Sequence, residues 1–88
     1  MIEDALFLRR KRALHRARYR GCLEADLLLG RFAAQFVPRF DADELAAFER
    51  LLDEADVDIL AWYCGRRPAP ARHDNEVFRL LRSFEPKA

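Results

Sequence analysis

The residues that could perform catalysis are few in this 88-residue chain, and they stand far apart. Neither His15 nor His73 has a histidine or cysteine three or four positions away, the spacing that places two metal ligands on one helix face. Ser83 is the only serine and has no neighbouring base. Because an enzyme site needs several such groups together, the sequence predicts that the chain is not an enzyme. Both histidines are expected at the surface or at a helix end.

Cysteine and glycine usage gives no sign of a cofactor site either. Cys22 and Cys64 are the only cysteines, and they form neither a C-x-x-C pair nor a zinc-ligand cluster. Two thiols with no evident pairing indicate a reducing compartment. Gly21, Gly30 and Gly65 are isolated, so the chain lacks a glycine-rich phosphate loop. The expectation is that this chain binds no metal and holds no cofactor tightly.

The stretch from Arg20 to Asp26 is the strongest candidate for a binding surface. Gly21 separates two helical patterns, and glycine is the usual residue just past a helix end, where a positive φ is needed. Glu24 and Asp26 then fall in the first turns of the next helix, where the helix dipole favours anions. The residues predict an exposed bend between the Arg20 cation and the Glu24 carboxylate. They are equally compatible with a helix cap and a local ion pair.

Charge is unevenly distributed along the chain, although the formal net charge is only +1. Basic residues crowd positions 9–20, and acidic residues crowd positions 41–58. Arg9, Arg12 and Arg16 are spaced to form a basic stripe on one helix, which would extend the binding surface of the bend. Such a dipolar chain would orient a charged partner, whereas ordinary solvated helix faces are the alternative interpretation.

The hydrophobic pattern predicts five helices and no strand. Apolar residues recur three and four positions apart in five segments: 3–19, 22–37, 42–53, 57–64 and 71–84. Asp41 with Glu44 predicts a capping box for the third segment, and Asp56 is expected to cap the fourth, which ends at Gly65. The predicted fold is all-α, a small single-domain bundle of five short helices over residues 1–88.

The second predicted helix has the broadest apolar stripe, wide enough to face more than one neighbour: Leu23, Leu27, Leu28, Phe32, Ala33, Phe36 and Val37. Gly30 interrupts this helix and would permit a close contact with another one. Trp62 is expected in the core, because a large ring at helical spacing usually fills a bundle.

No part of the chain predicts passage into or across a membrane. No apolar run approaches the ~18 residues of a membrane-spanning helix, and the first residues lack the apolar segment of a signal peptide. We therefore expect no membrane insertion, and a location in the bacterial cytoplasm.

Two motifs together resemble a known family. Residues 20–27 match R-G-x-x-E-x-D-L, the signature of the succinate dehydrogenase assembly factors, which are flavinylation factors of bacteria and mitochondria. Residues 51–62 are similar to the family's second segment, L-L-D-x-x-D-x-D-L-x-x-W, with Ile59 in place of leucine. Cys22 stands where methionine is often found. The resemblance extends over about residues 10–65 and agrees with the size and helical pattern.

The resemblance implies a helical factor that binds the flavoprotein subunit of succinate dehydrogenase, and in some bacteria of fumarate reductase. It implies that the factor promotes covalent attachment of FAD to a histidine of that subunit, and that FAD is acted on in the partner. It also implies that the docking centre is formed by Arg20, Gly21 and Glu24, with Asp26 beside them.

Other classes of function remain as alternatives. The chain could be a generic helical protein–protein adaptor, an autonomous flavin enzyme, or a nucleic-acid-binding protein that uses the basic residues 9–20. Nucleic-acid binding is not expected, because the rest of the surface is acidic and only Tyr19 adds an aromatic ring among those arginines.

Overall fold

Five α-helices and two short 3₁₀ turns make up the computed structural model, which describes residues 2–86, with side chains from Ala5 onward. The helices are α1 (Ile2–Arg18), α2 (Leu23–Phe36), α3 (Ala42–Leu52), α4 (Asp56–Cys64) and α5 (Glu76–Ser83). The 3₁₀ turns η1 and η2 cover Val37–Arg39 and Ala71–His73. No β-strand occurs in the described residues, and the prediction of a small all-α domain of five helices is confirmed.

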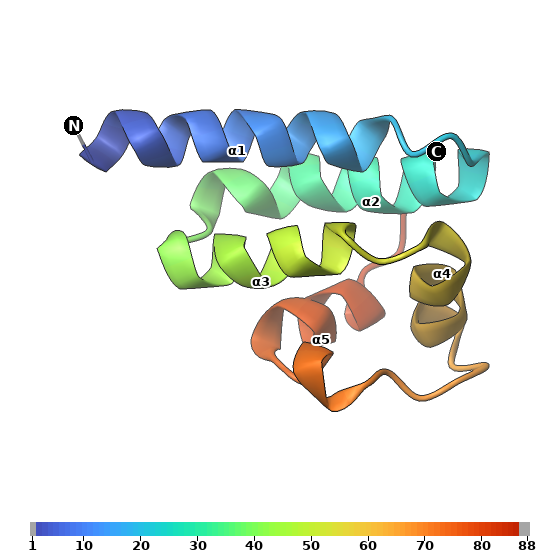
Figure 1. Cartoon of the computed structure of the whole chain (residues 1–88). Coiled ribbons are helices and arrows are strands. Elements are labelled where there is room, and N and C mark those ends of the chain that lie inside the picture. The colour runs from blue at the N-terminus through green and yellow to red at the C-terminus, as the bar shows by residue number, and fades with distance from the viewer. Residues whose placement is uncertain (1, 87–88) are drawn as a thin grey trace.

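The helices form two groups, α1 to α3 and α4 with α5, that share one core (Figure 1). The long helix α1 packs antiparallel to α2 and also contacts α3, while α5 packs against α3 and α4. The close contact expected at Gly30 is present, since an added Cβ would lie 3.3 Å from Arg18 Cγ and 3.8 Å from the Ala17 carbonyl oxygen. None of the helices within residues 2–86 has both the length and the apolar character needed to cross a membrane.

Local capping signals set several of the helix ends. The Asp41 carboxylate accepts a hydrogen bond from the Glu44 N–H (2.8 Å), and the Glu44 carboxylate accepts one from the Asp41 N–H (2.9 Å). This is the predicted capping box at the start of α3. Gly65 ends α4 with a φ of 79°, as its position predicted. The boundaries of α1, α2 and α3 differ from the predicted ones by at most one residue.

One predicted helix cap and one predicted helix start are wrong. Ala55, not Asp56, is the N-cap of α4, because the Asp56 carboxylate accepts from the Arg20 guanidinium instead. The fifth helix begins at Glu76 rather than at position 71. Residues 71–73 form η2, and the side chain of Asn75 then caps α5 by accepting from the Phe78 N–H (2.9 Å).

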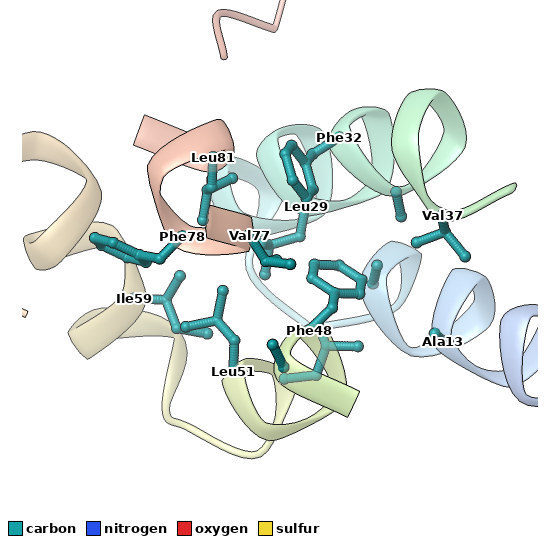
Figure 2. Close-up of a cluster of buried hydrophobic side chains, with 14 of the residues drawn as sticks. Ala13, Leu29, Phe32, Val37, Phe48, Leu51, Ile59, Val77, Phe78 and Leu81 are labelled. Carbon is teal, nitrogen blue, oxygen red and sulfur yellow. The ribbon is translucent and has the colours of Figure 1, made fainter. Parts of the chain in front are cut away.

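The core joins side chains from all five helices (Figure 2). Phe32 of α2 is fully buried, and its ring centroid lies 4.9–6.2 Å from those of four other phenylalanines: Phe36, Phe40, Phe48 and Phe84. Trp62 is 6% exposed, so its predicted core position is confirmed.

The prediction that Leu23 and Leu27 belong to the buried stripe of α2 is wrong. Leu23 is 73% exposed and Leu27 is 41% exposed. The apolar stripe of α2 is wider than the surface that its neighbours cover, since the part carrying Leu28, Leu29 and Phe32 is buried. An apolar edge of α2 therefore faces solvent.

Candidate functional site

The bend predicted at Gly21 lies between α1 and α2. Gly21 has a φ of 87°, and Cys22, the N-cap of α2, has an extended backbone with no side-chain capping bond. The left-handed φ reverses the chain within a few residues, which favours glycine because other residues pay a steric cost there. We refer to residues 19–26 as the Gly21 corner.

The Arg20 side chain turns into the fold and ties the corner to the connection between α3 and α4. Its Nε donates to Asp56 Oδ1 (2.7 Å), its Nη1 to the Leu52 carbonyl oxygen (2.7 Å) and its Nη2 to the Glu54 carbonyl oxygen (2.9 Å). The Arg20 side chain is only 11% exposed, and that of Asp56 is 21% exposed. Because Leu52 is the last residue of α3, the guanidinium also satisfies a carbonyl that the helix leaves without a partner.

Asp26 fixes the same corner from the α2 side. Its Oδ1 accepts a hydrogen bond from the backbone N–H of Arg20 (2.6 Å), and its own N–H donates to the Cys22 carbonyl oxygen (2.8 Å). The side chain therefore holds the incoming chain against the first turn of α2. Asp26 and Arg20 both position the backbone of the corner.

The expected arrangement of an exposed cation and an exposed carboxylate on either side of Gly21 is only half present. Glu24 is exposed, whereas the Arg20 guanidinium is engaged within the fold. Three acceptors spread over the α3–α4 connection, on Leu52, Glu54 and Asp56, explain this, because the fork of an arginine side chain can donate to several oxygens at once. The two sequence motifs, about 30 residues apart, thus meet in a single set of contacts.

Tyr19, Gly21, Leu23 and Glu24 are the exposed residues of the corner, and the last three, around the start of α2, form what we call its outward face. A Cβ built on Gly21 would meet nothing within 4 Å, so the backbone there is open to an approaching molecule. Glu24 also lines a groove of about 450 Å³ together with Val57, which is 71% exposed. The rest of that groove comes from the end of α4 and the residues after it: Leu60, Ala61, Cys64, Arg66 and Arg67.

Sequence reasoning did not select Leu23 or Val57 as surface residues of a site. Leu23 follows the apolar spacing of α2, so nothing local distinguishes it from its buried neighbours. Val57 stands between Asp56 and Asp58 at the start of α4, and these neighbours do not mark it as exposed either, because the Asp56 side chain itself is mostly buried against Arg20.

Two of the three arginines of the predicted basic stripe on α1 are paired with carboxylates of the same chain. Arg9 pairs with Glu49 of α3 (2.7 Å), and the hydrogen bond that the guanidinium donates to this carboxylate raises the pKa of Arg9. Arg16 pairs with Asp53 (2.7 Å). Arg12 is exposed and forms no ion pair with any described residue. The segregation of charge along the chain therefore does not give two oppositely charged faces, because α1 lies against acidic residues of α3 and the turn after it.

His73 is 2% exposed, so the predicted surface position is wrong for it, although it does lie at a helix end, as the last residue of η2. Its Nε2 lies 2.6 Å from Glu54 Oε2, and its ring is 5.4 Å from that of Trp62. Hydrogen bonds from Arg72 and then from His73 lower the pKa of Glu54 to about 2. This arrangement attaches η2 to the α3–α4 connection, and tertiary packing that no local pattern reveals explains the error. No group of three or more metal-ligating side chains converges among the described residues.

Comparison with known proteins identifies a family. The family model described as flavinator of succinate dehydrogenase matches residues 11–85. Succinate dehydrogenase assembly factor 2-B, mitochondrial, of Drosophila ananassae is 38% identical over 81 residues, which are 90% of this chain and 50% of that protein. Assembly factor 2-A, mitochondrial, of Drosophila mojavensis is 38% identical over 82 residues, or 91% of this chain and 52% of the relative. This chain thus spans about half the length of these curated relatives.

The names of these relatives bear on two predictions. They describe assembly factors rather than enzymes, in agreement with the prediction of a non-enzymatic assembly factor. They also say mitochondrial, which contradicts the predicted location in the bacterial cytoplasm. That prediction rested on unpaired thiols and on the lack of a secretory signal, and neither feature distinguishes a bacterial cytoplasm from a mitochondrial compartment.

The family match covers most of the chain, and it includes the Gly21 corner, the α3–α4 connection and the contacts of Arg20 between them. The recognised motifs and the family model therefore agree on the same region of the structure. The chain belongs to the family of flavinators of succinate dehydrogenase.

Proposed function

We propose that this chain binds the flavoprotein subunit of succinate dehydrogenase, or of fumarate reductase, and promotes covalent attachment of FAD to that subunit. Family membership supports the role in assembly. The binding surface in this proposal is the outward face of the Gly21 corner. The observation that carries it is a backbone fixed from within by Arg20 and Asp26 while Gly21, Leu23 and Glu24 remain exposed.

The two faces of the corner have separate roles in this proposal. The inward face, Arg20 and Asp26, sets the backbone geometry before any partner arrives. A preorganised surface loses less conformational entropy on binding. The outward face offers an open backbone at Gly21, an apolar side chain at Leu23 and a carboxylate at Glu24, so it combines close approach with an apolar contact and a charge-assisted hydrogen bond. Arg12 extends this surface along α1.

The chain supplies binding and orientation rather than reacting groups. FAD and the histidine that accepts it belong to the partner, as the family resemblance implies, and bond formation takes place there. The isolated glycines of this chain support that division, because they form no phosphate cradle. By binding the conformation in which acceptor and flavin lie together, the chain would increase the rate through an orientation effect.

The test is a flavinylation assay with the purified apo-flavoprotein subunit, FAD and this chain, with covalent flavin measured by fluorescence of the denatured subunit. Gly21→Arg should abolish the stimulation while the far-UV circular dichroism of its helices is retained. The added side chain has space in the free protein, but it occupies the surface against which the partner would lie. Its cost to stability is limited to about 1 kcal/mol from the positive φ.

Gly65→Ala is the control for backbone strain. Gly65 also has a positive φ (79°), and a Cβ there would lie 3.7 Å from the Arg82 guanidinium rather than facing open solvent. This variant should be destabilised to a similar degree and should still stimulate flavinylation. Equal stimulation by Gly21→Arg and the unmodified chain would exclude the corner as the docking surface.

The structure weakens the nucleic-acid-binding alternative. Arg9, Arg16 and Arg20 are each paired with a carboxylate of the same chain, so much of the basic segment is not available to phosphates. Binding to a helical partner other than the flavoprotein is tested by the same assay, because an adaptor of that kind would leave covalent flavin unchanged.

A further inference from the structure

A second surface, separate from the groove that Glu24 and Val57 line, runs along the contact between α1 and α2. A recess of about 600 Å³ lies there, with Leu14 of α1 facing Leu27 and Ala34 of α2, and Pro38 at one end. A smaller recess of about 220 Å³ beside Phe7 and Lys11 shares Leu14 and Pro38 with it. We refer to these adjoining recesses as the α1–α2 trough. It has no lining residue in common with the groove at Glu24.

The lining residues follow helical spacing on both walls. Phe7 and Leu14 are seven residues apart on α1, and Leu27 and Ala34 are seven residues apart on α2, so each pair projects to one side of its helix. Gly30 lies between the latter two and lets α1 approach closely. Phe7 is 57% exposed and Leu27 is 41% exposed. The trough is thus an apolar strip that the fold leaves in contact with water.

The charged groups along the trough are mainly cations. Lys11 and Arg18 are exposed, and neither forms an ion pair with a residue in the described part of the chain, although the Lys11 ammonium lies 5.5 Å from the centre of the Phe7 ring. Arg31 is a further lining cation, and Asp26 is the acidic lining residue, already bonded to the Arg20 N–H. Lys11 and Arg18 are seven residues apart, about 10.5 Å along the helix axis.

We propose that the α1–α2 trough binds an amphipathic, acidic helix of a partner protein. Apolar side chains of that helix occupy the recess between Leu14, Leu27 and Ala34, as in other helix-in-groove complexes. Carboxylates two turns apart on the helix match the spacing of Lys11 and Arg18. A small anion is too short to contact both cations. A flat membrane surface would leave a concave recess unfilled, whereas a helix presents a convex ridge of side chains to it.

The direct test is a titration of the isotope-labelled chain with a synthetic helical peptide of about five turns. The peptide carries leucines on one face and glutamates seven residues apart beside them, and a second peptide has lysine in place of each glutamate. The acidic peptide should shift the amide resonances of Leu14, Leu27 and Ala34, and the lysine peptide should bind at least about tenfold more weakly. Equal binding of both peptides, or no binding at millimolar peptide, would overturn the proposal.

Two matched pairs of variants locate the binding site. Ala34→Glu places a carboxylate in the trough, whereas Gln35→Glu places one on the next exposed residue of α2, outside the lining. Lys11→Glu reverses a cation of the trough, and Arg50→Glu makes the same change on the exposed surface of α3. The first member of each pair should weaken binding of the acidic peptide by about tenfold, and the second by less than twofold. Equal effects within a pair would contradict the assignment.

Two further measurements distinguish other occupants. If vesicles of anionic phospholipid perturb the trough resonances and the acidic peptide does not, the surface binds membranes and the proposal is wrong. If sedimentation equilibrium shows a dimer that Ala34→Glu dissociates, a second copy of the chain covers the trough, and the proposal is again wrong. The proposal is supported if the chain is a monomer, does not bind the vesicles and binds the acidic peptide.

Discussion

Two turns of this molecule, at Gly21 and at Gly65, use glycine with nearly the same φ but are held in different ways. At Gly65, the N–H donates to the Trp62 carbonyl oxygen and the Arg66 N–H to that of Ala61, so the end of α4 is closed by its own backbone. At Gly21, the holding contacts come from side chains. Asp26 binds the Arg20 N–H, and the Arg20 guanidinium reaches residues more than 30 positions away.

The difference shows what a local signal can and cannot specify. A glycine that ends a helix can be recognised from its neighbours, and both turns were predicted in this way. The contacts that stabilise the turn are harder to predict from sequence, because Leu52 and Asp56 come close to Arg20 only in the folded chain. The Gly21 turn therefore depends on the whole domain, whereas the Gly65 turn depends mainly on α4.

The largest expected effect is the loss of stability on replacing Arg20. Arg20→Ala removes three hydrogen bonds and leaves Asp56 without its partner in a mostly buried position, so the free energy of unfolding should fall by about 3 kcal/mol. Arg20→Lys should restore little of this, because one ammonium cannot match three separate acceptors. Urea unfolding measures both variants.

The matched change at the other turn is Arg66→Ala. Arg66 is exposed and directly follows Gly65, so its removal should change the free energy of unfolding by less than about 0.5 kcal/mol. Similar losses in the free energy of unfolding for Arg20→Ala and Arg66→Ala would show that side chains stabilise both turns equally. That result would contradict the difference between the Gly21 and Gly65 turns.

The next effect concerns binding rather than stability. Glu24→Ala should weaken binding of the flavoprotein subunit by on the order of 2 kcal/mol, as expected for an interface hot spot. Its effect on unfolding should be small, because Glu24 is exposed. Isothermal titration calorimetry and thermal unfolding measure the two quantities separately.

Asp43→Ala is the control for Glu24→Ala. Asp43 is also an exposed carboxylate in the first turn of a helix, so both variants lose the same favourable interaction with a helix dipole. Asp43→Ala should leave binding unchanged. If Glu24→Ala instead lowers only thermal stability, Glu24 serves the start of α2 and not the partner.

The smallest effect is a dependence of stability on pH. The pKa of Glu54 is lowered to about 2 from an ordinary value of 4.5 by Arg72 and then by His73, while its carbonyl accepts from Arg20. A lowered pKa means that the ionised group stabilises the fold above about pH 4.5, and this contribution is lost as the pH falls toward 2. Glu54→Gln should therefore be less stable than the parent at neutral pH.

The difference between parent and Glu54→Gln should shrink as the pH falls below about 4.5. Urea unfolding at a series of pH values measures it. A difference that stays constant with pH would mean that the charge of the Glu54 carboxylate does not stabilise the fold. It would also mean that the contacts which fix the Gly21 corner do not depend on that charge.

Much of the fold could be predicted because its signals are local. The capping box of Asp41 and Glu44, the glycine turns and the apolar spacing each act within a few residues, and they placed most helix ends within one residue. The N-cap of α4 was wrongly predicted for the opposite reason. Asp56 has the sequence position of a cap, but a distant guanidinium binds its carboxylate.

The sequence selected the residues of the candidate site but did not predict the orientation of their side chains. Sequence reasoning selected Arg20, Gly21, Glu24 and Asp26, and the structure brings all four together at one corner. It did not predict that Arg20 and Asp26 would face inward or that Leu23 would face outward, because the direction of a side chain depends on which helix lies beside it.

The inward position of Arg20 has a consequence for genetics. A substitution there should deplete the protein in cells, because an unfolded fraction is removed by proteases. A substitution at Glu24 should leave normal amounts of an inactive protein. Two defects in one short motif would then have the same phenotype for different reasons, and immunoblotting of the steady-state level would tell them apart.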